Sequence, residues 1–416
     1  MKLYDLRCHN RSLLVWPLFL LVVVFSCHKQ QQSATSEATE QADNERTATT
    51  EASPIHTSMK LFDGGNESIY HSFRIPSIIK TQNGTLVAFA EGRRWSPSDY
   101  GDINVVFKRS LNNGSTWSAL GEVAASGSGT WGNPTAVYDP NLGTNGRLWL
   151  FMCWNDGAID EWADFDSWGD RKVYSSYSDD HGATWSTPFD RTSTLVPPTY
   201  KWDAVGPGNG IVTAYNHPGR LIIPALGRNI YSDDHGVTWQ YQLIPGTTDE
   251  STIVELMDGR LMRNDRPNTS TWNTTKKRRK SFGTIEGGFG AFAADNALTD
   301  PKCEGSMIRY NTDAPARIYF LNPNDIDQRC NMTVRISYDE GQTWARSRPI
   351  FDWNTCDYAS ITVAKGGYTS MAKTADYCVG ALIEINENVH SSSTSNKSIE
   401  FHKFNLPWIL NGSTEP

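Results

Sequence analysis

Short apolar runs separated by clusters of turn-forming residues fill the chain from residue 59 to about residue 411. Residues 85–89, 147–152 and 219–224 are examples of these runs. Runs of this length between Gly, Asn, Asp and Pro are typical of β-strands. The sequence shows no long stretch of helical periodicity, so the pattern predicts an all-β fold.

One eight-residue pattern, Ser-x-Asp-x-Gly-x-Thr-Trp, occurs four times in this region, and we call it the Asp turn. The copies occupy residues 110–117, 178–185, 232–239 and 337–344, and Asn112 replaces the Asp in the first copy only. The Gly supplies the positive φ of a tight turn, and the Asp or Asn side chain bonds to nearby backbone. We therefore predict that each copy is a structural turn between two strands, anchored by its Trp, and that none contacts a ligand.

The spacing of the Asp turns predicts the number of structural units. Successive copies begin 68, 54 and 105 residues apart, and the last interval is about twice the second, as expected if one unit lacks the turn. A unit of roughly 50 to 60 residues that holds four strands is typical of a propeller blade. Residues 57–412 therefore predict one six-bladed β-propeller domain, without a second domain.

The N-terminal part of the chain has a different character. Residues 1–27 combine a basic start with a mostly apolar run, which is typical of a secretory signal. Residues 24–27, Val-Phe-Ser-Cys, are similar to a lipoprotein cleavage box, so lipidation of Cys27 and an uncleaved membrane anchor are both open. Residues 28–56 are polar, lack Phe, Tyr and Trp, and predict a disordered linker. An export signal followed by a linker predicts that the propeller lies outside the cytoplasm, at the cell surface, in the periplasm or secreted.

The amino-acid composition limits the classes of molecule that the protein is expected to bind. The chain has 38 Lys and Arg against 46 Asp and Glu, a formal charge of −8, which argues against nucleic acid as a partner. The basic run at residues 276–280 is an exception that we interpret as a solvated loop. The counts of 15 Trp and 16 Tyr suit a β-rich protein and also suit carbohydrate binding, because aromatic faces stack on sugar rings.

The cysteines do not suggest a metal site. Cys8 and Cys27 belong to the leader, and the other five of the seven show no metal-ligand spacing. We therefore expect neither a metal nor a cofactor. One or two disulfides would suit an exported protein, but the sequence does not reveal their pairing.

Phe73-Arg74-Ile75-Pro76 opens the first predicted blade. Together with the four Asp turns, it resembles the sialidase (neuraminidase) family of bacterial and animal type, over residues 60–390. The resemblance implies a six-bladed propeller with its site at the centre of one face. It implies a glycoside hydrolase that removes terminal sialic acids from sialylated glycans with retention of configuration, and we expect a monomer. The alternatives are transfer to a sugar acceptor or an internal hydroxyl, and a non-catalytic propeller that binds sialylated glycans.

Three arginines of the family bind the carboxylate of sialic acid, for which Arg provides fixed charge and forked donors. Arg74 matches the first of them. Arg266 matches the second, with Arg263 as its competitor, and Arg329 matches the third, with Arg335 as its competitor.

The family nucleophile matches Tyr368, and Tyr358 is a competitor of similar spelling. The substrate carboxylate would repel a carboxylate nucleophile, and sialidases are an exception among glycosidases in using Tyr. Glu250 matches the group that accepts the Tyr proton. Glu255 lies an odd number of positions after Glu250 in the same predicted strand, so we expect its side chain to face the opposite side of the sheet.

The resemblance also assigns residues around these groups. Asp99 matches the general acid on a polar loop, with Asp102 as the alternative in the same loop. Arg93 matches an additional arginine beside the three. Glu384 matches the carboxylate that orients Arg74.

Overall fold

The alternation of apolar and turn-forming residues produces strands β1 to β26 in the part of the chain that the structure describes. The computed structural model describes residues 53–416 except 68, 161–164, 247, 358, 360, 361 and 388–396. The predicted signal, most of the predicted linker and the competitor Tyr358 lie outside the described residues. The described residues belong to one unit, Ser53–Pro416, and none of their helices is long and apolar enough to cross a membrane.

The strands form six antiparallel groups, one for each predicted blade. Blade 1 contains β2 (Ser72–Lys80), β3 (Leu86–Arg93), β4 (Ile103–Ser110) and β5 (Gly121–Ala124). Blade 2 contains β6 (Thr130–Asp139), β7 (Arg147–Asn155), β8 (Lys172–Ser178) and β9 (Phe189–Asp190). Blade 3 contains β11 (Ile211–Val212), β12 (Leu221–Ala225), β13 (Arg228–Ser232) and β14 (Gln240–Leu243). Blade 4 contains β15 (Thr248–Glu255), β16 (Leu261–Pro267), β17 (Lys277–Thr284), β18 (Gly288–Phe289) and β19 (Ala293–Thr299). Blade 5 contains β20 (Ser306–Asn311), β21 (Arg317–Pro323), β22 (Met332–Ser337) and β23 (Arg346–Pro349). Blade 6 contains β24 (Ala364–Lys373), β25 (Val379–Asn386), β26 (Ser398–Phe404) and β1 (His56–Phe62).

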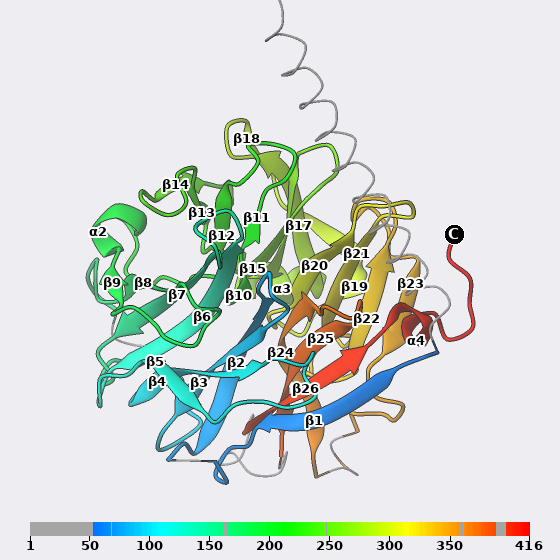
Figure 1. Cartoon of the computed structure of the whole chain (residues 1–416), viewed down its shortest axis with the longest axis horizontal. Helices are drawn as coiled ribbons and strands as arrows, with labels where there is room; N and C mark the ends of the chain where they lie inside the picture. The colour runs from blue at the N-terminus through cyan, green and yellow to red at the C-terminus, as the bar shows by residue number, and fades with distance from the viewer. Residues whose placement is uncertain are drawn as a thin grey trace, which may run out of the picture. The chain divides into compact units, whose positions relative to one another are not determined.

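The six groups follow one another around a central axis (Figure 1). Blades 1 and 2 are joined by one parallel pair, Ile103 with Thr130, and β10 (Gly208–Asn209) adds a short parallel pair to β6. The first and last strands of the domain share blade 6, because β1 pairs antiparallel with β26. The predictions of an all-β fold and of a six-bladed propeller are confirmed.

Each Asp turn connects the third and fourth strands of a blade, as the third copy shows. Ser232 Oγ accepts the Gly236 N–H at 2.8 Å, and Asp234 Oδ1 accepts the Thr238 N–H at 2.8 Å. Gly236 has a φ of 85°, which only glycine adopts readily. The copies lie in blades 1, 2, 3 and 5, so the long last interval corresponds to blade 4, which lacks the turn. None of the copies lines the cavity described below, and their predicted structural role is confirmed.

Replacing Gly236 with Ala is expected to destabilise the domain by about 2 to 4 kcal/mol, from the positive φ and from overpacking combined. A Cβ at Gly236 would overlap the Trp149 indole, whereas a Cβ at Gly246, whose φ is 86°, would meet no atom within 4 Å. Gly246→Ala therefore carries the backbone penalty without the clash and is the matched control. Urea denaturation measures both variants, and equal losses of stability would show that the Trp149 contact is unimportant.

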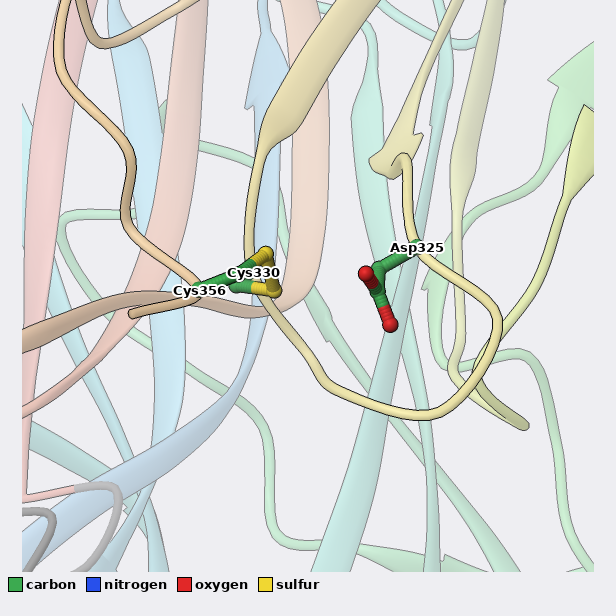
Figure 2. Close-up of side chains that lie close together, drawn as sticks. All are labelled: Asp325, Cys330 and Cys356. Carbon is green, nitrogen blue, oxygen red and sulfur yellow. A yellow bond between two sulfur atoms is a disulfide. The ribbon is translucent and has the colours of Figure 1, made fainter. Parts of the chain in front are cut away.

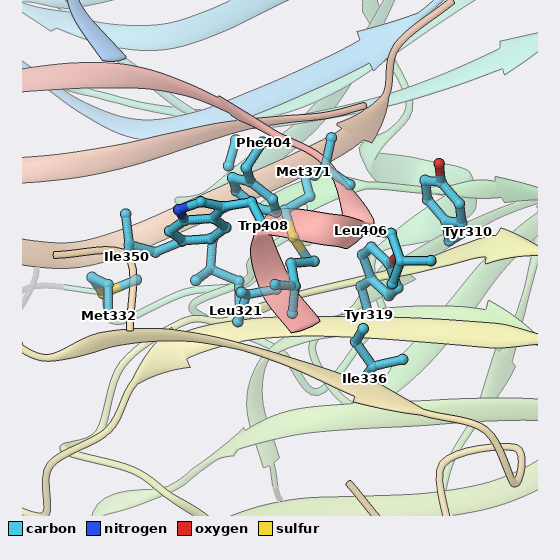
Figure 3. Packing of buried hydrophobic residues seen from close by; sticks show 14 of the residues in the cluster. Tyr310, Tyr319, Leu321, Met332, Ile336, Ile350, Met371, Phe404, Leu406 and Trp408 are labelled. Carbon is cyan, nitrogen blue, oxygen red and sulfur yellow. The ribbon is translucent and has the colours of Figure 1, made fainter. Parts of the chain in front are cut away.

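The apolar core lies between blades, and the cluster that joins blades 5 and 6 is capped by helix α4 (Leu406–Leu410) (Figure 3). Asn405 precedes α4, and its side chain accepts the N–H groups of Trp408 and Ile55. The ends of the domain are therefore fixed against each other, which supports ring closure at blade 6. The labelled members of the cluster are Tyr310, Tyr319, Leu321, Met332, Ile336, Ile350, Met371, Phe404, Leu406 and Trp408.

The interpretation of residues 276–280 as a solvated loop is wrong. After the short helix α3 (Thr269–Thr275), most of this run belongs to β17. Arg278 is fully buried, forms an ion pair with Asp300 at 3.0 Å and donates to Asn264. A buried cation of this kind is stable because acidic and amide partners surround it, and that environment comes from neighbouring strands.

Candidate active site

Side chains from all six blades line a cavity of about 400 Å³, a size that suits a small ligand. Seven of the eight predicted site residues belong to its lining, and Glu384 lies directly behind it. The seven are Arg74, Arg93, Asp99, Glu250, Arg266, Arg329 and Tyr368.

Tyr368 of β24 meets Glu250 of β15 and Arg266 of β16 in a closed hydrogen-bonded group. The Tyr368 hydroxyl donates to Glu250 Oε1 at 2.5 Å, and Arg266 Nη1 donates to Tyr368 Oη at 2.5 Å and to Glu250 Oε2 at 2.6 Å. Glu255, five positions further along β15, lies outside this group and accepts backbone N–H groups such as that of Asn216.

The electrostatics of this group favour a protonated Tyr368 in the free protein. Burial raises the pKa of the Tyr368 hydroxyl well above its ordinary value, and the Glu250 carboxylate adds to this effect, while Arg266 and Arg329 oppose it. Burial also raises the pKa of Glu250, against the attraction of Arg266. Tyr368 can therefore become a nucleophile only if its proton moves to Glu250 as its oxygen reacts.

The three predicted arginines surround the same tyrosine ring. The guanidinium carbons of Arg74 and Arg329 lie 5.3 and 5.1 Å from the ring centroid of Tyr368, and Arg266 bonds to its hydroxyl. Three strong cations beside one cavity provide a site for an anionic group.

The competing arginines lie outside the cavity lining. Arg263 is fully buried and pairs with Asp265 at 2.8 Å. Arg335 is also buried and donates to Asn322 at 2.8 Å. Arg263 also donates to the main-chain oxygen of Arg228 on β13 at 2.6 Å, so both arginines stabilise contacts between strands.

Arg74 is held by an irregularity in β2. The register between β2 and β3 shifts between Arg74 and Ser77, and Ile75 adopts a φ of 55°, which is unfavourable for a β-branched residue. Glu384 stabilises this backbone, because its carboxylate accepts the N–H groups of Ile75 at 2.8 Å and Tyr368 at 3.0 Å and also pairs with Arg74 at 3.1 Å. Although burial opposes ionisation, Arg74 and these N–H donors lower the pKa of Glu384, so it stays charged.

Asp99 stands at the cavity with its side chain 43 % exposed. It pairs with Arg93 at 2.6 Å and with Arg74 at 3.0 Å. Although partial burial opposes ionisation, these two guanidinium groups hold the pKa of Asp99 well below its ordinary value. Asp102, the alternative in the same loop, pairs with Arg94 at 3.2 Å and does not line the cavity.

Comparison with known proteins agrees with this arrangement. Residues 84–371 match the BNR repeat-like domain. The exo-alpha-sialidase of Aspergillus fumigatus is 42 % identical over 395 residues, which cover 87 % of this chain and 93 % of that protein. The chain belongs to the sialidase family. A second sialidase relative, the exo-alpha-sialidase of Arthroderma benhamiae, is 40 % identical over 423 residues, covering 95 % of this chain and 98 % of its own.

The solved structure of a Hadza microbial sialidase shares the fold of this sialidase family member. Its TM-score is 0.70 at 23 % identity, covering 85 % of this chain and 69 % of the other. The neighbouring structure therefore supports the β-propeller architecture.

Sequence reasoning missed a polar network on one side of the sialidase cavity. Glu91 pairs with Arg93 at 2.7 Å and accepts the Asn133 N–H at 3.0 Å, and Arg171 donates to Asn133 Oδ1 at 2.7 Å. Glu91 stands two residues before Arg93 in an otherwise apolar strand, so both face the same side, and that spacing was a usable signal. The remaining unpredicted lining residues are Ile75, Thr130, Trp202, Leu226, Thr248, Asp249, Asn268, Thr269 and Lys302.

One disulfide of this sialidase family member lies beside the cavity. Cys330, the neighbour of Arg329, is bonded to Cys356, and the Asp325 carboxylate faces them (Figure 2). These three side chains lie close enough to hold a metal ion, but the disulfide uses both sulfur atoms and leaves no thiolate. Cys153, Cys303 and Cys378 are free and buried.

Proposed function

We propose that this protein is an exo-α-sialidase that releases terminal α-linked sialic acids from glycans by hydrolysis with retention of configuration. The observation that carries the proposal is the group formed by Tyr368, Glu250 and Arg266 beneath two further arginines. A neutral tyrosine activated by a glutamate suits a substrate whose carboxylate would repel an anionic nucleophile. The two fungal relatives named exo-alpha-sialidases support the same activity.

Binding follows from the charges of the cavity. The carboxylate of sialic acid would be held by the forked donors of Arg74, Arg266 and Arg329. This places the anomeric carbon, which bears the carboxylate, next to the Tyr368 hydroxyl. Asp99 on the neighbouring loop then faces the oxygen that joins the sugar to the glycan.

The reaction proceeds in two displacements. Tyr368 Oη attacks the anomeric carbon while its proton moves to Glu250 Oε1, and Asp99 donates a proton to the departing glycosidic oxygen. Asp99, now ionised, takes a proton from water, whose oxygen attacks the same carbon. The bond to Tyr368 breaks, and Glu250 returns the proton to the tyrosine oxygen. Two inversions give retention.

The protonated Asp99 that this scheme needs is produced by substrate binding. In the free site Arg93 and Arg74 favour the ionised form of Asp99. A bound carboxylate neutralises part of the arginine charge and displaces water, and both effects raise the pKa of Asp99.

Purified protein incubated with sialyllactose tests the proposed function. We expect free sialic acid, with the α-anomer appearing first in a time-resolved NMR spectrum. A 2,7-anhydro product or a sialylated acceptor would instead show transfer, and absence of any turnover would contradict the enzymatic proposal.

The acid limb of the kcat profile, which reports groups in the substrate complex, is expected to move to lower pH when Asp249 is replaced by Asn. Glu250 must be ionised to accept the Tyr368 proton, so activity falls as the pH drops through the pKa of Glu250. Burial raises that pKa, and the Asp249 carboxylate raises it further, so removing the Asp249 charge lowers it. The control is Asp258→Asn, which makes the same charge change at an exposed position. A limb that moves equally in both variants would contradict this assignment.

We also propose that the propeller acts outside the cytoplasm. The support is the predicted secretory signal in residues 1–27 and the polar linker that follows. Mass spectrometry of the mature protein distinguishes a lipidated N-terminal Cys27 from an uncleaved leader, and a cytoplasmic protein with an intact leader would contradict export.

A further inference from the structure

We propose that the Cys330–Cys356 disulfide positions Arg329 for the substrate carboxylate, so that breaking it weakens substrate binding. The inference rests on the proposed function, in which Arg329 is one of three carboxylate-binding arginines. Cys330 is buried and follows Arg329 directly, while Cys356 is only partly buried, so the bond is open to a reductant.

Arg329 differs from the other two arginines in how its side chain is held. Arg74 pairs with Glu384 and Arg266 pairs with Glu250, so acidic side chains orient both guanidinium groups. Among the described residues no carboxylate lies within ion-pair distance of Arg329, whose Nη2 donates only to a main-chain oxygen, that of Lys302, at 3.1 Å. Apart from its stacking on the Tyr368 ring, the position of the Arg329 side chain therefore depends on its own backbone.

That backbone belongs to a loop, residues 324–331, between β21 and β22. Asp325 Oδ1 accepts the N–H groups of Asp327 and Gln328 at 2.8 Å, which shapes the turn before Arg329. Beyond Arg329, the loop is joined to another segment by the disulfide to Cys356 (Figure 2).

Among the described residues, two hydrogen bonds between Asn331 and Thr355 accompany the disulfide across this junction, the longer being from Thr355 Oγ1 to Asn331 Oδ1 at 3.5 Å. The Asn331 N–H donates to the Oγ1 of buried Thr355 at 2.6 Å. A Cβ at Gly366 would overlap the Arg329 carbonyl, so β24 also packs closely against this loop. The disulfide is thus the covalent restraint nearest to Arg329, and it ties the loop to the segment between β23 and β24.

Reduction removes this restraint and leaves the reacting groups in place. A dithiol reductant gives two electrons and two protons to the bond, forming two cysteine thiols and the cyclic disulfide of the reductant. Arg329 then samples more positions, while Tyr368 and Glu250 remain on β24 and β15. We expect KM to rise by about 10-fold with kcat changed less than 3-fold, because one of three carboxylate donors loses its fixed position.

The experiment compares oxidised and dithiothreitol-treated protein, with intact mass confirming which cysteines are reduced. EDTA is present in both samples, because Asp325 and two free thiols are close enough to bind a metal ion. Turnover of sialyllactose by the oxidised sample tests the proposed function separately. Calorimetry with N-acetylneuraminic acid measures binding without catalysis, and we expect a similar loss of affinity after reduction.

An Arg329→Ala background decides whether the effect acts through this arginine. There, reduction is expected to change KM by less than 2-fold, since the donor being positioned is absent. The Cys330→Ala/Cys356→Ala variant should match the reduced protein in either buffer, and Cys378→Ala, which removes a free buried thiol, should match the oxidised protein. Unchanged KM and affinity in fully reduced, folded protein would overturn the proposal, as would an equal effect in the Arg329→Ala background.

Discussion

Replacing Tyr368 with Phe is expected to lower kcat by roughly 10³-fold or more, since the variant loses the nucleophile itself. The ring remains, so its packing against Ile75 and Cys303 and the stacking of Arg74 and Arg329 on it persist. KM should therefore change far less than kcat. Steady-state kinetics with a fluorogenic sialoside gives both constants.

The control for this substitution is Tyr319→Phe. Tyr319 is a fully buried tyrosine of blade 5, it stacks on Tyr310, and its hydroxyl has no hydrogen-bond partner among the described residues. Removing that hydroxyl deletes the same atom at another buried position without touching the cavity. A Tyr368→Phe protein with kcat within 10-fold of the wild type would exclude Tyr368 as the nucleophile.

Acid quenching of the wild-type reaction gives independent evidence. The scheme requires a covalent bond between sialic acid and Tyr368 Oη during each turnover. Peptide mapping of quenched protein should find the sialic acid mass on the peptide that contains Tyr368 and on no other peptide. Its absence from quenched protein, under conditions where the second displacement is slow, would argue for direct attack by water.

The fold was predictable because its most informative signal is local. In the second Asp turn, Ser178 accepts from Gly182 and Asp180 accepts from Thr184, so all these partners lie within one eight-residue pattern. Blade 6 has no copy of the Asp turn because of the way in which the ring of blades closes. Its outer strand β1 comes from the start of the domain, so no turn links β26 to β1.

The site was only partly predictable because its residues depend on contacts between blades. The family resemblance identifies Arg93, but it identifies neither its partner Glu91 nor the contact of Glu91 with Asn133 in the next blade. The pairing of Cys330 with Cys356 was equally hidden, because five cysteines allow many combinations and only packed loops select one. The basic run around Arg278 predicts a solvated loop wrongly for the same reason, because the burial of Arg278 depends on its ion pair with Asp300.

Replacing Asp99 with Asn is expected to lower kcat/KM for sialyllactose by roughly 10²- to 10⁴-fold, the usual contribution of a general acid. Asn has the same size as Asp, and its amide oxygen can still accept hydrogen bonds from Arg93 and Arg74. The amide cannot, however, donate a proton to the leaving oxygen as a carboxylic acid does. The loss should depend on the leaving group. A 4-nitrophenol group departs without protonation, so kcat/KM for 4-nitrophenyl sialoside should fall at least 10-fold less than for sialyllactose.

This dependence on the leaving group separates proton donation from a structural role of Asp99. If Asp99 only held Arg93 and Arg74 in place, its loss would weaken the binding of both substrates equally, because both carry the same sialic acid. Asp102→Asn is the matched control, since Asp102 lies in the same loop and pairs with Arg94 outside the cavity. Equal losses for the two substrates in Asp99→Asn would contradict the acid assignment. A larger leaving-group dependence in Asp102→Asn would transfer that role to Asp102.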